Sequence, residues 1–98
     1  MDVEIVTVAV RDDLRMYGDD IAAAIDAYHA ASDGQICAVV ATAGTTNLGV
    51  IDDLVGAAKA AHDRNIWFHV DGAYGLAGLC APSVRAAFNG VELCDSFI

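Results

Sequence analysis

Short apolar runs alternate with alanine-rich stretches of helical periodicity along this chain of 98 residues. Residues 3–10, 36–41 and 66–70 have the length and the content of β-branched residues that are typical of strands. The run at 36–41 is uninterrupted, which predicts a strand buried on both faces. Residues 94–98 are a candidate for the start of a fourth strand. The alternation predicts an α/β fold with a mostly parallel sheet and crossover helices.

Aspartates mark the expected beginnings of two helices. Asp19 or Asp20 is expected to cap a helix that runs to about Ala31. Asp52 or Asp53 is expected to open a second, alanine-rich helix over about 53–64.

The remaining segments carry loop signals. Residues 44–49 are expected to form a loop, and the glycines at 72, 75 and 78 indicate a flexible or closely packed one. A short helix is expected to end at Phe88, with either Pro82 in its first turn or Ser83 as the cap of a still shorter helix.

The number of helices is too small for the expected sheet. Parallel strands need helices on both faces, and two full helices with one short helix cannot cover four strands. The mean hydropathy of +0.46 is high for a small protein, which indicates that part of its apolar surface is in contact with something that is not part of this chain. We therefore expect residues 1–98 to be the middle portion of a larger domain, with its N- and C-terminal parts missing.

The charge and the cysteine content limit the classes of binding partner and the cellular compartment that we expect. Five Lys and Arg stand against fourteen Asp and Glu, a net charge of −9 that disfavours nucleic acid and anionic membranes. Neither a membrane-spanning run nor a signal peptide is found. Cys37, Cys80 and Cys94 are widely spaced, and we expect them to be reduced and buried, as in a cytoplasmic protein.

Chemistry is expected where the parallel strands end, because ligands bind beyond the carboxyl ends of such strands. Thr46 follows the second strand and Asp71 the third. If these strands are neighbours, both residues face one crevice. Asp71 either caps a helix or a turn through backbone N–H groups or presents a fixed negative charge to a cationic group or a metal.

His69 and Asp71 alternate along a strand and so share a face, which makes them a possible pair of metal ligands. A metal site needs at least a third ligand. The alternative is that His69 has only a structural role, as a half-buried histidine bonded to backbone. Lys59, the only lysine, is expected to be a solvated charge on the second helix.

Three motifs in one order carry a family resemblance. They are Ala-Thr-Ala-Gly-Thr-Thr-Asn-Leu-Gly-Val-Ile-Asp-Asp, then Ile-Trp-Phe-His-Val-Asp-Gly-Ala-Tyr-Gly, then Phe-Asn-Gly-Val-Glu-Leu-Cys-Asp-Ser-Phe. The chain resembles the group II pyridoxal-phosphate-dependent decarboxylases, which include glutamate and aromatic amino-acid decarboxylases. The likeness covers essentially the whole chain and is strongest over 37–98.

The resemblance implies part of a fold-type-I large domain that binds pyridoxal 5'-phosphate. Asp71 matches the carboxylate that pairs with the pyridinium nitrogen and keeps the ring an electron sink. Thr46 matches a hydroxyl of the cofactor pocket, and Ala73 matches the small residue against one ring face. His69 matches a histidine just before this aspartate, which belongs to the surroundings of the cofactor and is not catalytic.

The resemblance also implies an activity. The whole protein would decarboxylate an L-amino acid through a Schiff base and a quinonoid intermediate, usually as a homodimer. The Schiff-base lysine, the stacking histidine and the phosphate-binding residues would lie outside the chain, so the isolated chain is expected to be inactive. The alternatives are another fold-type-I enzyme (an aminotransferase, a carbon–carbon lyase or a desulfurase), a metal-dependent hydrolase half-site at His69 and Asp71, and a non-catalytic α/β interaction module.

Overall fold

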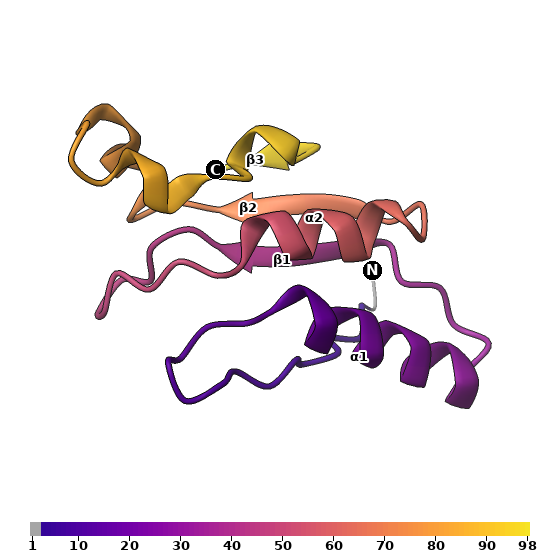
Figure 1. Cartoon of the computed structure of the whole chain (residues 1–98). Helices are drawn as coiled ribbons and strands as arrows, with labels where there is room; N and C mark the ends of the chain where they lie inside the picture. The colour runs from indigo at the N-terminus through magenta and orange to yellow at the C-terminus, as the bar shows by residue number, and fades with distance from the viewer. Residues whose placement is uncertain (1–2) are drawn as a thin grey trace.

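Three parallel strands, β1 (Ala38–Thr42), β2 (Trp67–Asp71) and β3 (Ser96–Phe97), form one sheet in this order, which confirms the expected α/β class. The structure is a computed structural model that describes residues 3–98 (Figure 1). Three short 3-10 helices join β2 to β3. The elements are α1 Gly18–Ala31, β1 Ala38–Thr42, α2 Leu54–His62, β2 Trp67–Asp71, η1 Leu76–Cys80, η2 Arg85–Phe88, η3 Val91–Leu93 and β3 Ser96–Phe97.

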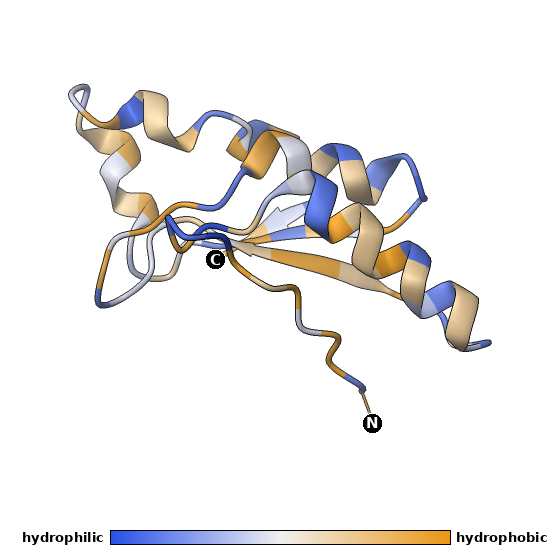
Figure 2. Ribbon diagram, turned by 60° about the horizontal axis from the view of Figure 1, so that its bottom comes forward, coloured by the Kyte–Doolittle hydropathy of each residue, from blue (hydrophilic) through white to orange (hydrophobic). Residues whose placement is uncertain are grey.

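Only one face of the sheet is covered by helices. Side chains alternate along β1 and β2, so Val39 and Phe68 are buried while Val40 and Trp67 are 55% and 54% exposed. Figure 2 shows α1 and α2 on the same side of the sheet. The prediction that residues 36–41 form a strand buried on both faces is therefore wrong, because the described chain supplies no second layer of helices. We call the uncovered side, which carries Val40 and Trp67, the open face.

Small residues let the helices approach one another and the sheet. The core side of α2 is made of buried alanines, and Phe68 of β2 is completely buried. A Cβ atom on Gly18 would lie 2.5 Å from the Cα of Gly56, so α1 begins in direct backbone contact with α2. Ile21 and Ile25 of α1 complete the core. Burial of these apolar side chains is the main source of stability.

The helix beginnings agree with the expectations in part. Asp53 caps α2 by accepting a hydrogen bond from the Gly56 N–H at 3.0 Å, as expected. Asp19 and Asp20 do not cap α1, because they lie inside its first turn, where they suit the helix dipole. The Gly18 N–H at this end instead donates to Asp53 Oδ2 at 3.1 Å. A residue distant in sequence thus replaces the expected local cap.

Residues 3–10 do not form the predicted strand. They run alongside α1, where Tyr28 Oη donates to Glu4 Oε2 at 3.5 Å, and Ile5 is 85% exposed. No strand of the described chain pairs with this segment through backbone hydrogen bonds, so it is not part of the sheet. The β-branched pattern is real, but a strand also requires a neighbour.

The glycines after β2 were expected to form either a flexible or a closely packed loop, and the structure shows a closely packed one. A Cβ on Gly78 would lie 2.8 Å from the ring of Phe88, which is buried. The expected short helix ending at Phe88 exists as η2, although it begins three residues after Pro82. The fourth expected strand is confirmed as β3. Within residues 3–98, no helix has the length and apolar character needed to cross a membrane.

The cysteines depart from the expectation of burial. Cys37 and Cys80 are exposed, and only Cys94 is partly buried. Cys37 lies just before β1 and Cys80 ends η1, both outside the layer between helices and sheet. All three are free thiols, and burial raises the pKa of Cys94 above its ordinary value.

Candidate functional site

The carboxyl ends of β1 and β2 lie side by side, which confirms that these strands are neighbours. Thr42 is the register partner of Asp71, and the Ala43 N–H donates to the Asp71 carbonyl at 2.7 Å. The loops that follow both strands therefore start from one edge of the sheet, where parallel α/β folds bind ligands (Figure 1).

The loop after β1 is held by its own backbone and by one threonine. Thr45 Oγ1 accepts from the Val50 N–H at 3.1 Å, and the Gly49 N–H donates to the Thr45 carbonyl at 2.8 Å. Thr46 is exposed, and its hydroxyl has no hydrogen-bond partner within residues 3–98. The loop thus uses one of its adjacent threonines for structure and leaves the other free for a ligand.

Two glycines bring the loops into contact. A Cβ on Gly44 would lie 2.5 Å from the Cα of Gly75, and a Cβ on Gly75 would lie 2.6 Å from the Ala43 carbonyl oxygen. Gly44 also has φ +95°, a conformation that favours glycine. The segment with Thr46 and the segment with Asp71 are therefore packed backbone to backbone.

Asp71 is a half-buried carboxylate at the end of β2. Its Oδ1 accepts from the Ala73 N–H at 3.1 Å, which is the turn cap that one of the two interpretations predicted. Among the described residues, no group donates to its Oδ2. Both interpretations are compatible with this geometry, because one oxygen caps the turn and the other can accept from a ligand. Ala73 is exposed and places only a methyl group beside the carboxylate.

His69 lies two residues before Asp71 on the open face. Its Nδ1 is 2.8 Å from Ser96 Oγ, so the expected bond to backbone is replaced by a bond to a hydroxyl. The third metal ligand that the hydrolase hypothesis requires is missing from the described residues, where no group of three His, Cys, Asp or Glu side chains converges. Lys59 is exposed and paired with Asp63, as expected of a surface charge.

His62 and Asp95 form a separate polar cluster at the opposite end of the strands. Asp95 Oδ2 accepts from the Phe68 N–H at 2.7 Å and lies 3.1 Å from His62 Nε2. The hydrogen bond from the Phe68 N–H is the main reason that the pKa of the Asp95 carboxyl lies below its ordinary value. The hydrogen bond with His62 is the second reason. This cluster joins β2 to β3 but lies away from the loops that carry Thr46 and Asp71.

Asp52 is a residue whose role the sequence did not reveal. Its Oδ2 accepts from the Thr42 N–H and its Oδ1 from the Met16 N–H, both at 2.8 Å. The Asp52 N–H returns a bond to the Thr42 carbonyl at 2.9 Å. The carboxylate thus ties the end of β1 to the segment before α1. The Asp-Asp pair indicated a helix beginning, but nothing local indicated the partner 36 residues earlier.

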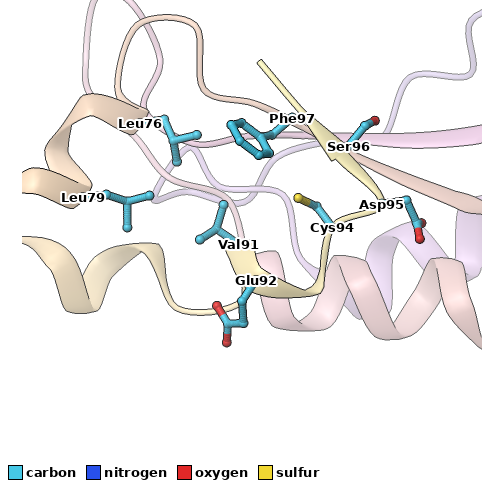
Figure 3. Close-up of a pocket in the computed structure, with 8 residues that line it drawn as sticks. All are labelled: Leu76, Leu79, Val91, Glu92, Cys94, Asp95, Ser96 and Phe97. Carbon is cyan, nitrogen blue, oxygen red and sulfur yellow. The ribbon is translucent and has the colours of Figure 1, made fainter.

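A hollow among the described residues lies elsewhere, beside β3. It has a volume of about 520 Å³. Figure 3 shows apolar side chains from η1, η3 and β3 around it, with Glu92 pointing away. Its lining is Leu76, Leu79, Val91, Glu92, Cys94, Asp95, Ser96 and Phe97. Neither Thr46 nor Asp71 belongs to this lining, so we place the candidate site at the ends of β1 and β2.

Comparison with known proteins gives one consistent result. The family model of the pyridoxal-dependent decarboxylase conserved domain matches residues 1–98. The L-2,4-diaminobutyrate decarboxylase of Rhizobium meliloti (strain 1021) is 51% identical over 67 residues, which are 67% of this chain and 13% of that protein.

Solved structures share the fold. Mouse CSAD superimposes with a TM-score of 0.85 and 32% identity, covering 92% of this chain and 19% of that one. Oryza sativa TDC, solved with PLP and tryptamine, gives a TM-score of 0.76 and 31% identity over 87% of this chain and 18% of that one. The chain spans less than a fifth of the length of these relatives.

Proposed function

The chain belongs to the pyridoxal-dependent decarboxylase family, and from this premise we propose that it forms one wall of a pyridoxal 5'-phosphate site. The site would belong to a longer enzyme that removes the α-carboxylate of an L-amino acid. The observation that carries the proposal is the free Oδ2 of Asp71 at the carboxyl end of β2. The other oxygen is held by the Ala73 N–H, so the carboxylate has a defined orientation.

The residues at the strand ends fit such a cofactor. A pyridinium N–H needs a carboxylate acceptor, and Asp71 has one oxygen available. A flat ring needs a neighbour without bulk, and Ala73 has only a methyl group. Polar groups of the cofactor need donors, and the Thr46 hydroxyl has no partner within the described residues.

Asp71 would hold the ring-nitrogen proton in place. When bound, the cofactor supplies a conjugated ring that takes up the electron pair left as the amino-acid carboxylate departs as carbon dioxide. A carboxylate at the ring nitrogen favours the protonated ring by direct charge pairing. An amide at this position keeps the shape of the side chain but loses the charge that retains the proton.

The neighbouring residues would orient the cofactor. Thr46 would donate its hydroxyl hydrogen to a polar substituent from the β1 side of the crevice. Ala73 would leave one ring face open to close approach, and His69 would support Asp71 from the open face of the sheet. The contact between Gly44 and Gly75 fixes the two loops relative to each other, which limits the reorganisation needed on binding.

The rest of the enzyme would cover the surfaces that this chain leaves exposed. Trp67 and Val40 on the open face are about half exposed, and the edge of β3 has no further strand among the described residues. These surfaces support our proposal that residues 1–98 are the middle of a larger cofactor-binding domain. The covalent lysine and the phosphate-binding residues would come from other segments, and a homodimer is the assembly that we propose.

The test uses the longer protein with and without the cofactor. We expect amino-acid-dependent release of carbon dioxide that is lost when pyridoxal phosphate is removed and regained when it is added. Asp71→Asn should lower kcat by about a hundredfold or more, because one preorganised charge at the reacting system is lost. Asp63→Asn, the same change at an exposed position on α2's end, should leave kcat unchanged.

Other outcomes would contradict the proposal in distinct ways. Formation of a keto acid without carbon dioxide would assign the site to an aminotransferase. Activity that persists without pyridoxal phosphate and disappears with a metal chelator would favour the hydrolase hypothesis. Near-normal turnover of Asp71→Asn would remove the role given to Asp71.

A further inference from the structure

The segment between β1 and α2 is a narrow loop (Figure 1), in which residues 43–45 run antiparallel to residues 49–51. We call this segment the ribbon. Its pairs are Ala43 with Ile51, Gly44 with Val50, and Thr45 with Gly49. Backbone hydrogen bonds of 2.8 and 3.0 Å connect the two sides, and the turn at the tip begins at Thr46. The position of Thr46 therefore depends on which residues of the two sides are paired.

Asp52 pairs with Thr42 at the base of the ribbon. The Asp52 N–H donates to the Thr42 carbonyl at 2.9 Å, and the Thr42 N–H donates to Asp52 Oδ2 at 2.8 Å. In a regular antiparallel pair, two opposite residues exchange both bonds through their backbones. Here the carboxylate takes the place of the Asp52 carbonyl, and its other oxygen accepts from the Met16 N–H at 2.8 Å. The base of the ribbon is thus fixed to β1 and to the segment before α1.

A slip of one residue at this base would misplace Thr46. Side chains alternate between the two faces of a ribbon, so a one-residue shift turns every side chain of one side to the other face. The exchange of two bonds between Thr42 and Asp52 opposes such a shift, because both bonds would be lost together. Asp53 cannot take over, since its two carboxylate oxygens accept from N–H groups at the beginnings of α2 and α1.

We propose that Asp52 is a positioning residue that fixes the register of the ribbon and so directs the Thr46 hydroxyl to the crevice beside Asp71. The proposal rests on the proposed function, since its purpose concerns a cofactor-binding hydroxyl. Thr42 is also the register partner of Asp71 in the sheet, so the base of the ribbon lies at the same sheet edge as the carboxylate. Asp52 acts through Thr42 and the ribbon, because both of its carboxylate oxygens already accept backbone N–H groups.

A double-mutant cycle in the longer protein tests whether Asp52 acts through Thr46. Asp52→Ala and Thr46→Val should each raise the dissociation constant for pyridoxal phosphate about fivefold, the effect of one ordinary hydrogen bond. The double variant should bind about as well as Thr46→Val alone, because both changes remove the same contact. Effects that multiply in the double variant would show that Asp52 acts elsewhere and would overturn the proposal.

Asp53→Ala is the matched control for lost stability. It also removes a carboxylate that accepts two backbone N–H groups, but neither group belongs to the ribbon. We expect it to leave the dissociation constant unchanged, and a rise equal to that of Asp52→Ala would overturn the positioning role. If Asp52→Ala fails to fold, Asp52→Asn replaces it in the cycle. The amide keeps one acceptor oxygen for two N–H donors, so its effect should be smaller but coupled to Thr46→Val in the same way.

The register can be measured in the full chain without any cofactor. Ala43 and Ile51 lie between two hydrogen-bonded pairs, where the backbones of opposite residues approach most closely. We expect a nuclear Overhauser effect between their α-protons that is weakened in Asp52→Ala and retained in Asp53→Ala. Its absence in the unsubstituted chain, or its full retention in folded Asp52→Ala, would overturn the proposal. Failure of the unsubstituted longer protein to bind pyridoxal phosphate would refute the proposed function, while this measurement would still decide whether Asp52 fixes the register.

Discussion

The backbones of Gly44 and Gly75 touch where the loops after β1 and β2 meet. A Cβ on either glycine would lie 2.5 Å from the Cα of the other, a distance that side chains do not tolerate. This contact places the loop of Thr46 against the loop of Asp71 and Ala73. The geometry of the candidate site therefore depends on two residues that have no side chains.

Gly44→Ala should destabilise the chain more than Gly49→Ala. Both glycines have positive φ, +95° and +65°, but only Gly44 has a backbone neighbour at contact distance. We expect a loss of about 1 kcal/mol for Gly49→Ala from backbone strain alone. Gly44→Ala should cost about 3 kcal/mol or more, because the clash adds to the strain. Urea unfolding measures both, and equal losses would contradict the contact.

Asp52→Ala should destabilise the chain strongly through two lost hydrogen bonds. The Thr42 and Met16 N–H groups would be left partly buried without acceptors, at a cost of about 3 kcal/mol in the free energy of unfolding. Asp63→Ala removes an exposed carboxylate paired with Lys59, and solvent screening should make its loss of stability much smaller. Thermal unfolding of both variants checks this prediction, which fails if the two losses are similar.

Asp95 should make stability fall in acid. Its pKa is held below the ordinary value in the folded chain by the Phe68 N–H and then by His62. A carboxyl with a lowered folded pKa contributes stability above its unfolded pKa and loses it as the pH falls through the folded value. Asp95→Asn should therefore reduce the difference in urea midpoint between about pH 7 and about pH 3. Asp33→Asn, at an exposed bend after α1, should not reduce it.

Ala73→Val should weaken cofactor binding without changing the fold. Ala73 is exposed, so the added methyl groups meet no protein atoms in the folded chain, but they would occupy the space proposed for the ring. In the longer protein we expect the dissociation constant for pyridoxal phosphate to rise about tenfold or more. Ala77→Val, an equivalent exposed change on η1, should leave it unaltered. Equal affinities in the two variants would show that Ala73 does not face the ring.

The sequence predicted those elements whose signals are local. The apolar run around Val39 and the alanine-rich helix capped by Asp53 are present because periodicity and capping act over a few residues. Residues 3–10 were predicted as a strand on the same kind of signal, but strands also need a partner, and the described chain offers none. The exposure of Cys37 and Val40 likewise depends on which faces of the sheet are covered by helices, and the local sequence pattern does not determine this.

The position of the candidate site could be predicted from the sequence, but the hydrogen bonds that hold the neighbouring segments in place could not. Asp71 and Thr46 are candidates because parallel strand ends are where ligands bind, and the structure confirms only that the two strands are neighbours. Asp52 and Ser96 were not assigned a role, because their partners Met16 and His69 lie 36 and 27 residues away. Such bonds depend on register between strands and segments, which a single sequence does not specify.

Asp71 is the residue that we propose to pair with the ring nitrogen of the cofactor. The most direct measurement is the ¹⁵N chemical shift of the ring nitrogen in the longer protein loaded with ¹⁵N-labelled pyridoxal phosphate. We predict a protonated nitrogen in the unsubstituted protein and loss of that proton in Asp71→Asn, with Asp63→Asn unchanged. An unprotonated nitrogen in the unsubstituted protein, or a protonated one in Asp71→Asn, would contradict the account.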